Sequence, residues 1–365
     1  MSKLKVVLLF GGRSSEHSIS CATAAGVLGA IDRTKYDIIP VGITKQGVFV
    51  PAEDNAERWA LRKGQLATVE FEGSTVEFAM DGSRELTLVT DSDSSAASRT
   101  SLGAIDLVFP VLHGPFGEDG TMQGYLELVG VPYVGNGVLA SAAGMDKEFS
   151  KALFLAAGVP VTPHVVIRED RWASDPESAL EAVRGLGGLP LFVKPARAGS
   201  SMGVSKVKTW DAFGDAVALA FEQDNKLVVE HGLVGREVEC AVLSSFDGKA
   251  PRVSVAGEIV VKGREFYDFD AKYQDEDSVD LIVPAELSDE QLAEMQTIAR
   301  RAFQALGCEG LGRVDFFLTE QGFFVNEINT MPGFTPLSMF PTLWQASGIA
   351  YPALIDELIA LALTN

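Results

Sequence analysis

The residues best suited to chemistry lie between Gly312 and Gly333. Two apolar, β-prone runs, 314–318 and 323–328, are joined through Glu320-Gln321-Gly322, a pattern typical of a hairpin with glycine in its connection. Strand side chains alternate between faces, so polar residues at alternate positions gather on one face. The sequence therefore predicts a hairpin with one polar face.

That face carries two carboxylates, one amide and one guanidinium. A three-residue connection pairs Thr319 with Phe323 and sets Asp315 opposite Glu327. The residues expected on the face are Arg313, Asp315, Glu327 and Asn329. Oxygen ligands of this kind suit a hard cation such as Mg²⁺, which takes one or two carboxylates and leaves its other positions to phosphate and water. The alternative is a half-buried hairpin whose polar face is solvated.

The segment that follows the hairpin favours the metal interpretation. Residues 330–336 read Thr-Met-Pro-Gly-Phe-Thr-Pro, so the second strand opens directly into irregular backbone. Binding and catalytic groups concentrate on such loops when a rigid scaffold holds them.

Residues 191–207 combine a lysine with a loop of small residues. An apolar strand ends at Lys194, a loop containing Gly199, Ser200, Ser201 and Gly203 follows, and a second strand begins at residue 204. Small residues let backbone N–H groups approach a phosphate chain, and a buried strand lysine is costly without an anion. The lysine precedes the glycines, unlike the Walker pattern, and a flexible hairpin tip is the alternative.

Two other segments place charges near these elements. Lys147 begins a helix that ends at Gly158, a position where a cation opposes the helix dipole. A strand ends at Glu230, and after a short turn another begins at Glu237, which offers backbone groups to a flat base and carboxylates to ribose hydroxyls. Lysines and glutamates are most often simply solvated, so each signal alone is weak.

Polar glycine loops follow two apolar strands in the N-terminal part. The run 5–10 is typical of a buried parallel strand and leads through Gly11-Gly12 to Glu16, while the run 105–111 leads to His113. Ligands of open α/β sheets bind beyond the carboxyl ends of strands, so both side chains are expected at a crevice. His113 is alternatively a core histidine satisfied by hydrogen bonds.

The remaining segments differ in how strongly they indicate a function. Residues 265–275 mix aromatic and charged side chains without a clean period, which predicts a lid loop with Lys272 and Tyr273 at its working end. Residues 52–104 give no functional signal, and the polar stretch 91–101 predicts an exposed loop.

Composition bounds the class of protein. The 365 residues carry a formal net charge of −20, which argues against affinity for nucleic acid or anionic membranes. Hydrophobic residues at 47% and charged residues at 22% are ordinary for a globular protein of two or three domains. Three widely separated cysteines without metal-ligand spacing indicate reduced core thiols in a cytoplasmic protein. No signal peptide and no membrane-spanning run is evident.

Together these segments resemble the D-alanine:D-alanine ligases of the ATP-grasp superfamily over nearly the whole chain. The matching motifs, in the family's order, are Gly11-Gly-Arg-Ser-Ser-Glu-His, His113-Gly-Pro-Phe-Gly-Glu-Asp-Gly-Thr, Gly144-Met-Asp-Lys, Val193-Lys-Pro-Ala-Arg-Ala-Gly-Ser-Ser-Met-Gly-Val-Ser-Lys, Tyr267-Asp-Phe-Asp-Ala-Lys-Tyr, Gly312-Arg-Val-Asp and Asn326-Glu-Ile-Asn-Thr-Met-Pro-Gly-Phe-Thr. Two departures are visible, because Ser18 stands where the family often has Glu and residues 52–104 match no motif. Neither touches the expected chemistry.

The resemblance implies a mixed α/β and α+β fold of three domains in the ATP-grasp architecture. We expect an N-terminal parallel-sheet substrate domain at residues 1–140, a central domain at 141–245, and a C-terminal domain with lid loop and metal hairpin at 246–365. The antiparallel sheets of the last two would sandwich ATP. A cytoplasmic homodimer is also implied, which composition does not show.

The implied activity is ATP-dependent ligation of two D-alanine molecules through an acyl phosphate, for synthesis of a peptidoglycan precursor. ATP is a substrate, and two Mg²⁺ ions, for which Mn²⁺ can substitute, would be held by Asp315, Glu327 and Asn329. The residues implied to bind nucleotide are Lys147, Lys194, Ser200, Ser201, Glu230, Leu233, Glu237 and Lys272. Those implied to bind the amino acids are Glu16, His113, Tyr267, Arg313, Gly333, Ser338 and Met339. Those implied in the chemical steps are Glu16, Ser200, Lys272, Tyr273, Arg313 and Gly333.

Three alternatives stand beside this interpretation. They are an ATP-grasp ligase for another amino-acid pair, a nucleotide-binding regulatory protein that has lost catalysis, and a nicotinamide-dependent dehydrogenase. The Glu16 motif and the lid argue against the first, and the retained metal ligands with Arg313 argue against the second. The incomplete glycine fingerprint argues against the third.

Overall fold

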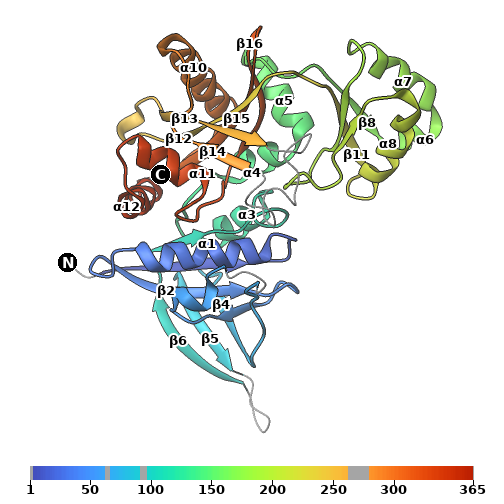
Figure 1. The fold of residues 1–365 in the computed structure, drawn as a ribbon. Coiled ribbons are helices and arrows are strands. Elements are labelled where there is room, and N and C mark those ends of the chain that lie inside the picture. The colour runs from blue at the N-terminus through green and yellow to red at the C-terminus, as the bar shows by residue number, and fades with distance from the viewer. Residues whose placement is uncertain (1–2, 62–65, 91–96, 262–278, 365) are drawn as a thin grey trace.

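The computed structural model describes residues 3–61, 66–90, 97–261 and 279–364. Within these residues four sheets form the frame of the molecule. Figure 1 shows the N-terminal elements at the bottom, the C-terminal elements above them, and the central elements to one side. Parallel and antiparallel sheets coexist, which confirms the predicted mixed fold class.

The first sheet is mainly parallel and forms from the apolar runs of the N-terminal part. Its strands are β1 (Leu4–Gly11), β2 (Tyr36–Ile43), β3 (Phe49–Pro51) and β7 (Leu107–Pro110), in the order β3-β2-β1-β7. Val6 and Leu8 pack in one cluster with α1 (His17–Ala30), whereas Val7 and Leu9 pack in another with α3 (Thr121–Val129). The run in β1 is continuously apolar because both faces of the strand are covered.

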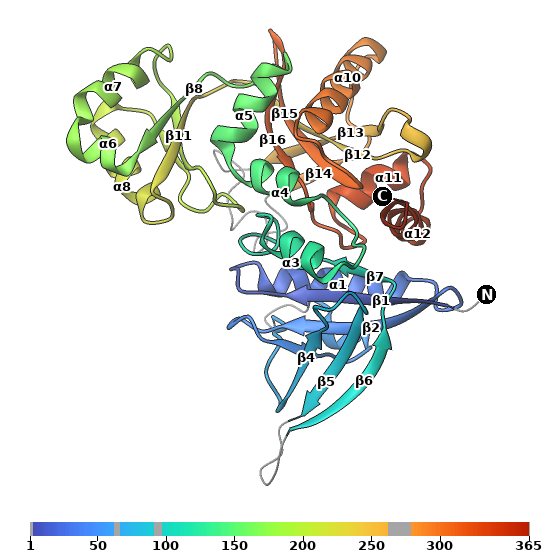
Figure 2. The same cartoon turned by 180° about the vertical axis from the view of Figure 1, so that it is seen from behind.

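A second N-terminal sheet occupies the segment that gave no functional signal. Its strands are β4 (Ser74–Phe78), β5 (Glu85–Thr90) and β6 (Ser98–Ala104), all antiparallel, and the short helix α2 (Ala56–Trp59) precedes them. The predicted exposed loop over 91–101 is therefore wrong from Ser98 onward, since backbone pairing with β5 makes a strand of polar residues. Figure 2 shows this sheet extending away from the other domains.

The central sheet is antiparallel. Its strands are β8 (His164–Arg168), β9 (Leu191–Pro195), β10 (Ser205–Val207) and β11 (Lys226–His231), in the order β10-β9-β11-β8. The helices of this part are α6 (Glu169–Ser174), α7 (Pro176–Arg184) and α8 (Phe213–Phe221), with a 3-10 turn at Trp210–Ala212. Buried residues of α7 and α8 pack with the strands in one core, so the sheet keeps its other face for polar contacts.

The C-terminal sheet has the order β14-β13-β12-β15-β16. Its strands are β12 (Arg236–Leu243), β13 (Arg252–Val261), β14 (Val279–Ile282), β15 (Leu311–Thr319) and β16 (Gly322–Asn329), with a 3-10 turn at Phe246–Gly248. The expected domain boundary at residue 245 falls inside this sheet, because β12 pairs with both β13 and β15. The change from one sheet to the other lies between His231 and Arg236.

Helices join the domains. α4 (Val138–Met145) and α5 (Lys147–Ala156) lead from the N-terminal domain toward the central sheet, and α10 (Asp289–Ala305) covers the C-terminal sheet. The helices α11 (Met339–Ala346) and α12 (Tyr351–Ala362) share one core with β1 and α1. The loops after β1 and after β16 are thus held by a common apolar core, which fixes their relative position.

The hairpin of β15 and β16 has an irregularity that the sequence did not predict. At its tip Thr319 pairs with Gly322, so the predicted pairing of Thr319 with Phe323 is wrong. A β-bulge at Asn326 then shifts the register by one residue, and Asp315 pairs with Glu327 as predicted. The bulge compensates for the tighter turn and keeps both carboxylates at the same level of the sheet.

All three cysteines are buried and form no disulfide, in line with the predicted core thiols. In the part of the chain that the structure describes, no helix is both long and apolar enough to cross a membrane.

Candidate active site

The polar face of the hairpin forms a connected set of charged groups. Arg313 donates from Nε to Asp315 Oδ1 and from Nη2 to Asp315 Oδ2, both at 2.7 Å. Asn329 donates from Nδ2 to Asp315 Oδ2 at 2.9 Å. Arg313 Nε also lies 2.8 Å from Glu239 Oε2. The guanidinium is therefore oriented by two carboxylates, which fixes the direction of its remaining donors.

Glu239 is a residue that the sequence analysis missed. It pairs with Asp315 across β12 and β15, and Asp315 pairs with Glu327 across β15 and β16. Three carboxylates therefore form a row over three adjacent strands. The only sequence signal was the alternation Glu237-Val-Glu239, which does not reveal the neighbouring strand.

The predicted metal ligands have suitable chemistry for a hard cation. Asp315, Glu327 and Asn329 offer oxygen atoms on one face of the hairpin, as Mg²⁺ prefers. Within the described ranges, no group of three or more His, Cys, Asp or Glu side chains is arranged to hold a metal. Two carboxylates and an amide match the way Mg²⁺ is usually bound, with phosphate and water at its other positions.

Two lysines lie beside this face. Lys147, the first residue of α5, donates from Nζ to the Ala198 carbonyl at 3.0 Å and lies 3.4 Å from Glu327 Oε2. Asp146 caps the helix by accepting from two backbone N–H groups, so α5 begins at Lys147. Lys194 on β9 donates to Glu230 Oε2 at 2.7 Å. The two lysines predicted to bind phosphate therefore lie near the hairpin predicted to bind the metal.

The Ser200 loop contacts the N-terminal domain. Ser200 Oγ donates to Glu16 Oε1. Ser200 and Ser201 have φ angles of 51° and 57°, a left-handed backbone that costs energy for residues other than glycine and often marks a functional loop. The loop predicted to cover phosphate thus reaches the carboxylate predicted to bind the amino acid.

The predicted adenosine residues lie along the link between the two antiparallel sheets. Glu230 is on β11, Leu233 is half-buried in the link, and Glu237 is on β12. The Glu230 side chain is buried and engaged by lysines, so a contact with adenine would have to come from its backbone. Burial would raise the pKa of Glu230, but Lys151 and Lys194 lower it to about 2.

The other end of the site is acidic. His113 Nδ1 lies 3.3 Å from the Met331 carbonyl and Nε2 lies 3.2 Å from Thr23 Oγ1, which matches the alternative of a core histidine satisfied by the protein. Burial lowers the pKa of His113, so the ring is neutral. Glu118 accepts from the Gly114 N–H at 2.5 Å, and burial together with the nearby Glu16 carboxylate raises the pKa of Glu118 to about 8.

Glu118 lies in the motif that begins at His113, but the sequence predicted no role for its side chain. Its neighbour Gly114 has a φ of 72°, and a Cβ there would lie 2.8 Å from Glu16 Oε2. Glycine is required both by the backbone and by the approach of the Glu16 carboxylate.

The loop after β16 places the remaining predicted residues. Ser338 precedes α11 at the N-cap position, and its Oγ accepts from the Thr335 N–H at 3.1 Å, not from the helix backbone. A Cβ on Gly333 would lie 3.2 Å from Ser338 Oγ, so these two residues are neighbours. Met339 is the first residue of α11 and is buried. The predicted residues Tyr267, Lys272 and Tyr273 lie outside the described residues.

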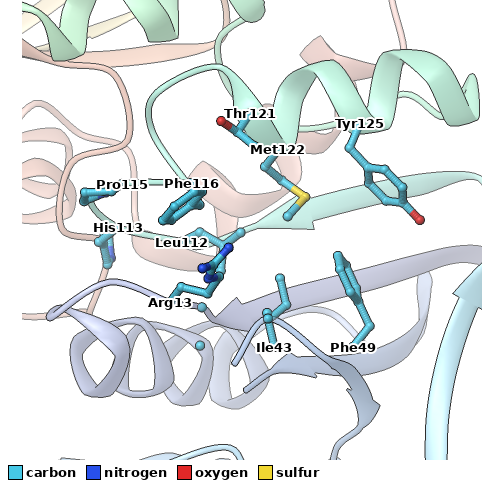
Figure 3. A pocket seen from close by; sticks show the side chains of 14 residues that line it. Arg13, Ile43, Phe49, Leu112, His113, Pro115, Phe116, Thr121, Met122 and Tyr125 are labelled. Carbon is cyan, nitrogen blue, oxygen red and sulfur yellow. The ribbon is translucent and has the colours of Figure 1, made fainter. Parts of the chain in front are cut away.

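A largely apolar cavity of about 240 Å³ lies behind the Gly12 and His113 loops. Figure 3 shows Arg13 at this cavity together with Phe116, whose ring lies 4.4 Å from the guanidinium carbon. None of the predicted phosphate or metal residues is among the described residues that line it. We therefore do not assign the reaction to this cavity.

Comparison with known proteins agrees with this geometry. Family models described as "D-ala D-ala ligase N-terminus" and "D-ala D-ala ligase C-terminus" match residues 5–136 and 153–360. The chain is 53% identical over 367 residues to the D-alanine--D-alanine ligase of Arthrobacter sp. (strain FB24), covering 100% of this chain and 95% of that protein. It is 51% identical over 373 residues to the enzyme of that name from Streptomyces griseus, covering 100% and 93%.

Two solved ligase structures share the fold of this chain. The VanG D-Ala:D-Ser ligase from Enterococcus faecalis superposes with a TM-score of 0.82 at 34% identity, covering 99% of this chain and 100% of that one. The D-alanine-D-alanine ligase from Coxiella burnetii superposes with a TM-score of 0.81 at 34% identity, covering 100% and 95%. The family models and the relatives together show that this chain belongs to the D-alanine–D-alanine ligase family.

Proposed function

We propose that this protein joins two D-alanine molecules into D-alanyl-D-alanine, with conversion of ATP to ADP and phosphate, as a step toward a peptidoglycan precursor. The observation that carries the proposal is the contact between Ser200 and Glu16, because it joins the phosphate loop to the carboxylate at the amino-acid end. Family membership supplies the substrate class.

In the first step a carboxylate oxygen of one D-alanine attacks the γ-phosphorus of ATP. The bond from that phosphorus to the bridging oxygen breaks, and ADP leaves with the electron pair. The product is an acyl phosphate. Lys147 and Lys194 would neutralise phosphate oxygens, and Glu16 would bind the ammonium group, which keeps that amine from acting as a nucleophile.

In the second step the neutral amine of another D-alanine attacks the acyl carbon. The carbon–oxygen bond to phosphate breaks, inorganic phosphate leaves, and the nitrogen loses a proton as the amide forms. Arg313, held by Asp315 and Glu239, and the Gly333 N–H would donate to the oxyanion of the tetrahedral intermediate. Ser338 and Met339 would bind the carboxylate of the second substrate.

Asp315, Glu327 and Asn329 would hold Mg²⁺, or Mn²⁺ in its place. When bound, the metal supplies charge neutralisation at the phosphate chain. The lid residues Tyr267, Lys272 and Tyr273 are assigned by family resemblance, with Lys272 at the phosphates and Tyr273 at the acceptor.

The test is release of ADP and formation of dipeptide with Mg·ATP and different amino acids. D-alanine alone should support turnover and give a dipeptide, whereas L-alanine and the reaction without amino acid should give only background. D-serine and D-lactate, each added with D-alanine, show how strictly the acceptor is chosen. If ATP binds but no D-amino acid stimulates turnover, the ligase proposal fails.

Family membership also leads us to propose that the protein is a cytoplasmic homodimer. Sedimentation at micromolar concentration should give twice the mass of 39.0 kDa. A monomer in that measurement would contradict the assembly without affecting the proposed reaction.

A further inference from the structure

Lys151 is a buried lysine that the proposed reaction does not use. Its side chain is 0% exposed, and it is among the largest fully buried side chains of the described residues. An ammonium group without water is costly unless it is paired and hydrogen-bonded. Its partners should therefore show why a lysine occupies this position.

The partners come from both antiparallel sheets. Lys151 Nζ lies 2.8 Å from Glu230 Oε1 on β11 and donates to the Asn326 carbonyl on β16 at 3.2 Å. Lys194 Nζ lies 2.7 Å from the other Glu230 oxygen and donates to Asn326 Oδ1 at 3.1 Å. These four residues form a closed ring, which we call the Lys151 ring. Asn326 is the bulge residue of β16. The bulge therefore supplies both the carbonyl that contacts Lys151 and the side chain that contacts Lys194.

The charges of the ring do not cancel. Two lysines share one carboxylate, so the ring carries a net charge of +1 when both lysines are protonated. Burial lowers the pKa of Lys151, and the Glu230 carboxylate opposes that shift. If Lys151 were absent, Glu230 and Lys194 would form a neutral pair. The attraction of Lys194 for a phosphate chain would fall, because Glu230 would compete for it without a second cation.

We propose that Lys151 is a positioning residue that holds Glu230 and so keeps Lys194 available to the nucleotide phosphates. It acts through Glu230 and touches no substrate. The inference rests on the proposed function only in that Lys194 faces phosphate. The proposal predicts that the affinity for ATP and ADP falls when the net charge of the Lys151 ring falls.

The experiment compares binding of ATP, ADP and adenosine by calorimetry, without amino acid. Lys151→Met lowers the ring charge to zero and should weaken ATP and ADP about tenfold or more, the loss typical of a hydrogen bond to a charged group. Adenosine has no phosphate, so its affinity should not change. The double variant Lys151→Met/Glu230→Gln restores a charge of +1 and should recover most of the ATP affinity.

Lys226 gives a matched control. It is also buried on β11, and its Nζ lies 2.5 Å from Asp146 Oδ2 and 2.8 Å from Glu148 Oε2, neither of which belongs to the Lys151 ring. Lys226→Met should destabilise the protein, and its loss of stability measures the cost of removing a buried lysine that is not part of the Lys151 ring. Thermal unfolding of each variant separates loss of structure from loss of binding.

Two outcomes would overturn the proposal. Lys151→Met could bind ATP as tightly as the wild type, or it could lose ATP and adenosine equally with no recovery in the double variant. The second result would assign Lys151 a purely structural role. A wild-type protein that binds no ATP would instead contradict the proposed function.

Discussion

Two glutamates in this molecule, Glu230 and Glu118, have pKa values shifted in opposite directions. Glu230 is buried, whereas Glu118 is half-buried. Lys151 and Lys194 surround Glu230, and despite burial they lower its pKa to about 2. Glu118 lies near the Glu16 carboxylate, and burial with that neighbour raises its pKa to about 8. The pKa of the same type of side chain is therefore shifted in opposite directions in the two regions.

The difference separates the two ends of the site. The nucleotide end carries more cations than carboxylates around Glu230, which suits an anionic phosphate chain. The amino-acid end carries the Glu16 carboxylate beside His113, whose pKa is lowered by burial, and this arrangement suits an ammonium group. The Ser200 contact to Glu16 joins these ends. Each end therefore has an excess of the charge opposite to its proposed ligand.

The largest expected effect comes from a substitution that disrupts the nucleotide end of the site. Glu230→Gln leaves Lys151 and Lys194 without their shared carboxylate, and breaking a buried ion pair typically costs about 3–5 kcal/mol of unfolding free energy. Urea unfolding at pH 7 measures the loss. Because the folded-state pKa is lowered, the stabilisation from Glu230 is present above about pH 4.5 and is lost as pH falls toward 2. Equal stability of variant and wild type at pH 7 would contradict the ion-pair assignment.

The next effect tests the acidic end. Glu16→Gln removes the charge proposed to bind the ammonium of the first D-alanine, and kcat/KM for D-alanine should fall about 10- to 100-fold, in line with a charged hydrogen bond. ATP affinity should stay the same. Ser200→Ala removes the hydroxyl that contacts Glu16 and should have a smaller effect on kcat/KM for D-alanine. Unchanged kcat/KM in Glu16→Gln would remove this residue from the proposed site.

A smaller effect concerns Glu118 and pH. Because the folded-state pKa is raised, the contribution of Glu118 is most favourable below about pH 4.5 and declines as pH rises toward 8. Glu118→Gln cannot ionise, so the stability of the variant relative to the wild type should rise by at least about 1.4 kcal/mol across this window, the equivalent of one pKa unit. Urea unfolding at pH 5 and pH 8 measures the difference. A constant difference would show that the pKa of Glu118 is ordinary.

The smallest effect concerns the acceptor. Replacing Tyr273 with His should shift acceptor preference from D-alanine toward D-lactate, because family resemblance assigns this position to acceptor choice. Competition between the two acceptors, with products separated by mass spectrometry, measures the ratio. Glu16→Gln is the contrasting variant, since it should change the first substrate and leave acceptor preference unaltered. An unchanged ratio in Tyr273→His would count against the assignment.

The sequence by itself determined the local elements that carry the site. The hairpin followed from two β-prone runs with glycine between them, and the polar face followed from alternation. The phosphate loop and the glycine loops after β1 and β7 followed from small residues at strand ends. These patterns depend on neighbouring residues, so a single chain read in order reveals them.

Only the tertiary structure decided which elements meet. Glu239 joins the carboxylate row because β12 lies beside β15, and β12 belongs to the C-terminal sheet although the sequence suggested a later boundary. The bulge at Asn326 and the buried position of Lys151 also depend on contacts between distant segments. Strand order and burial are set by long-range packing, which local propensity does not encode. Burial and neighbouring charge, in turn, gave Glu230 and Glu118 opposite pKa shifts.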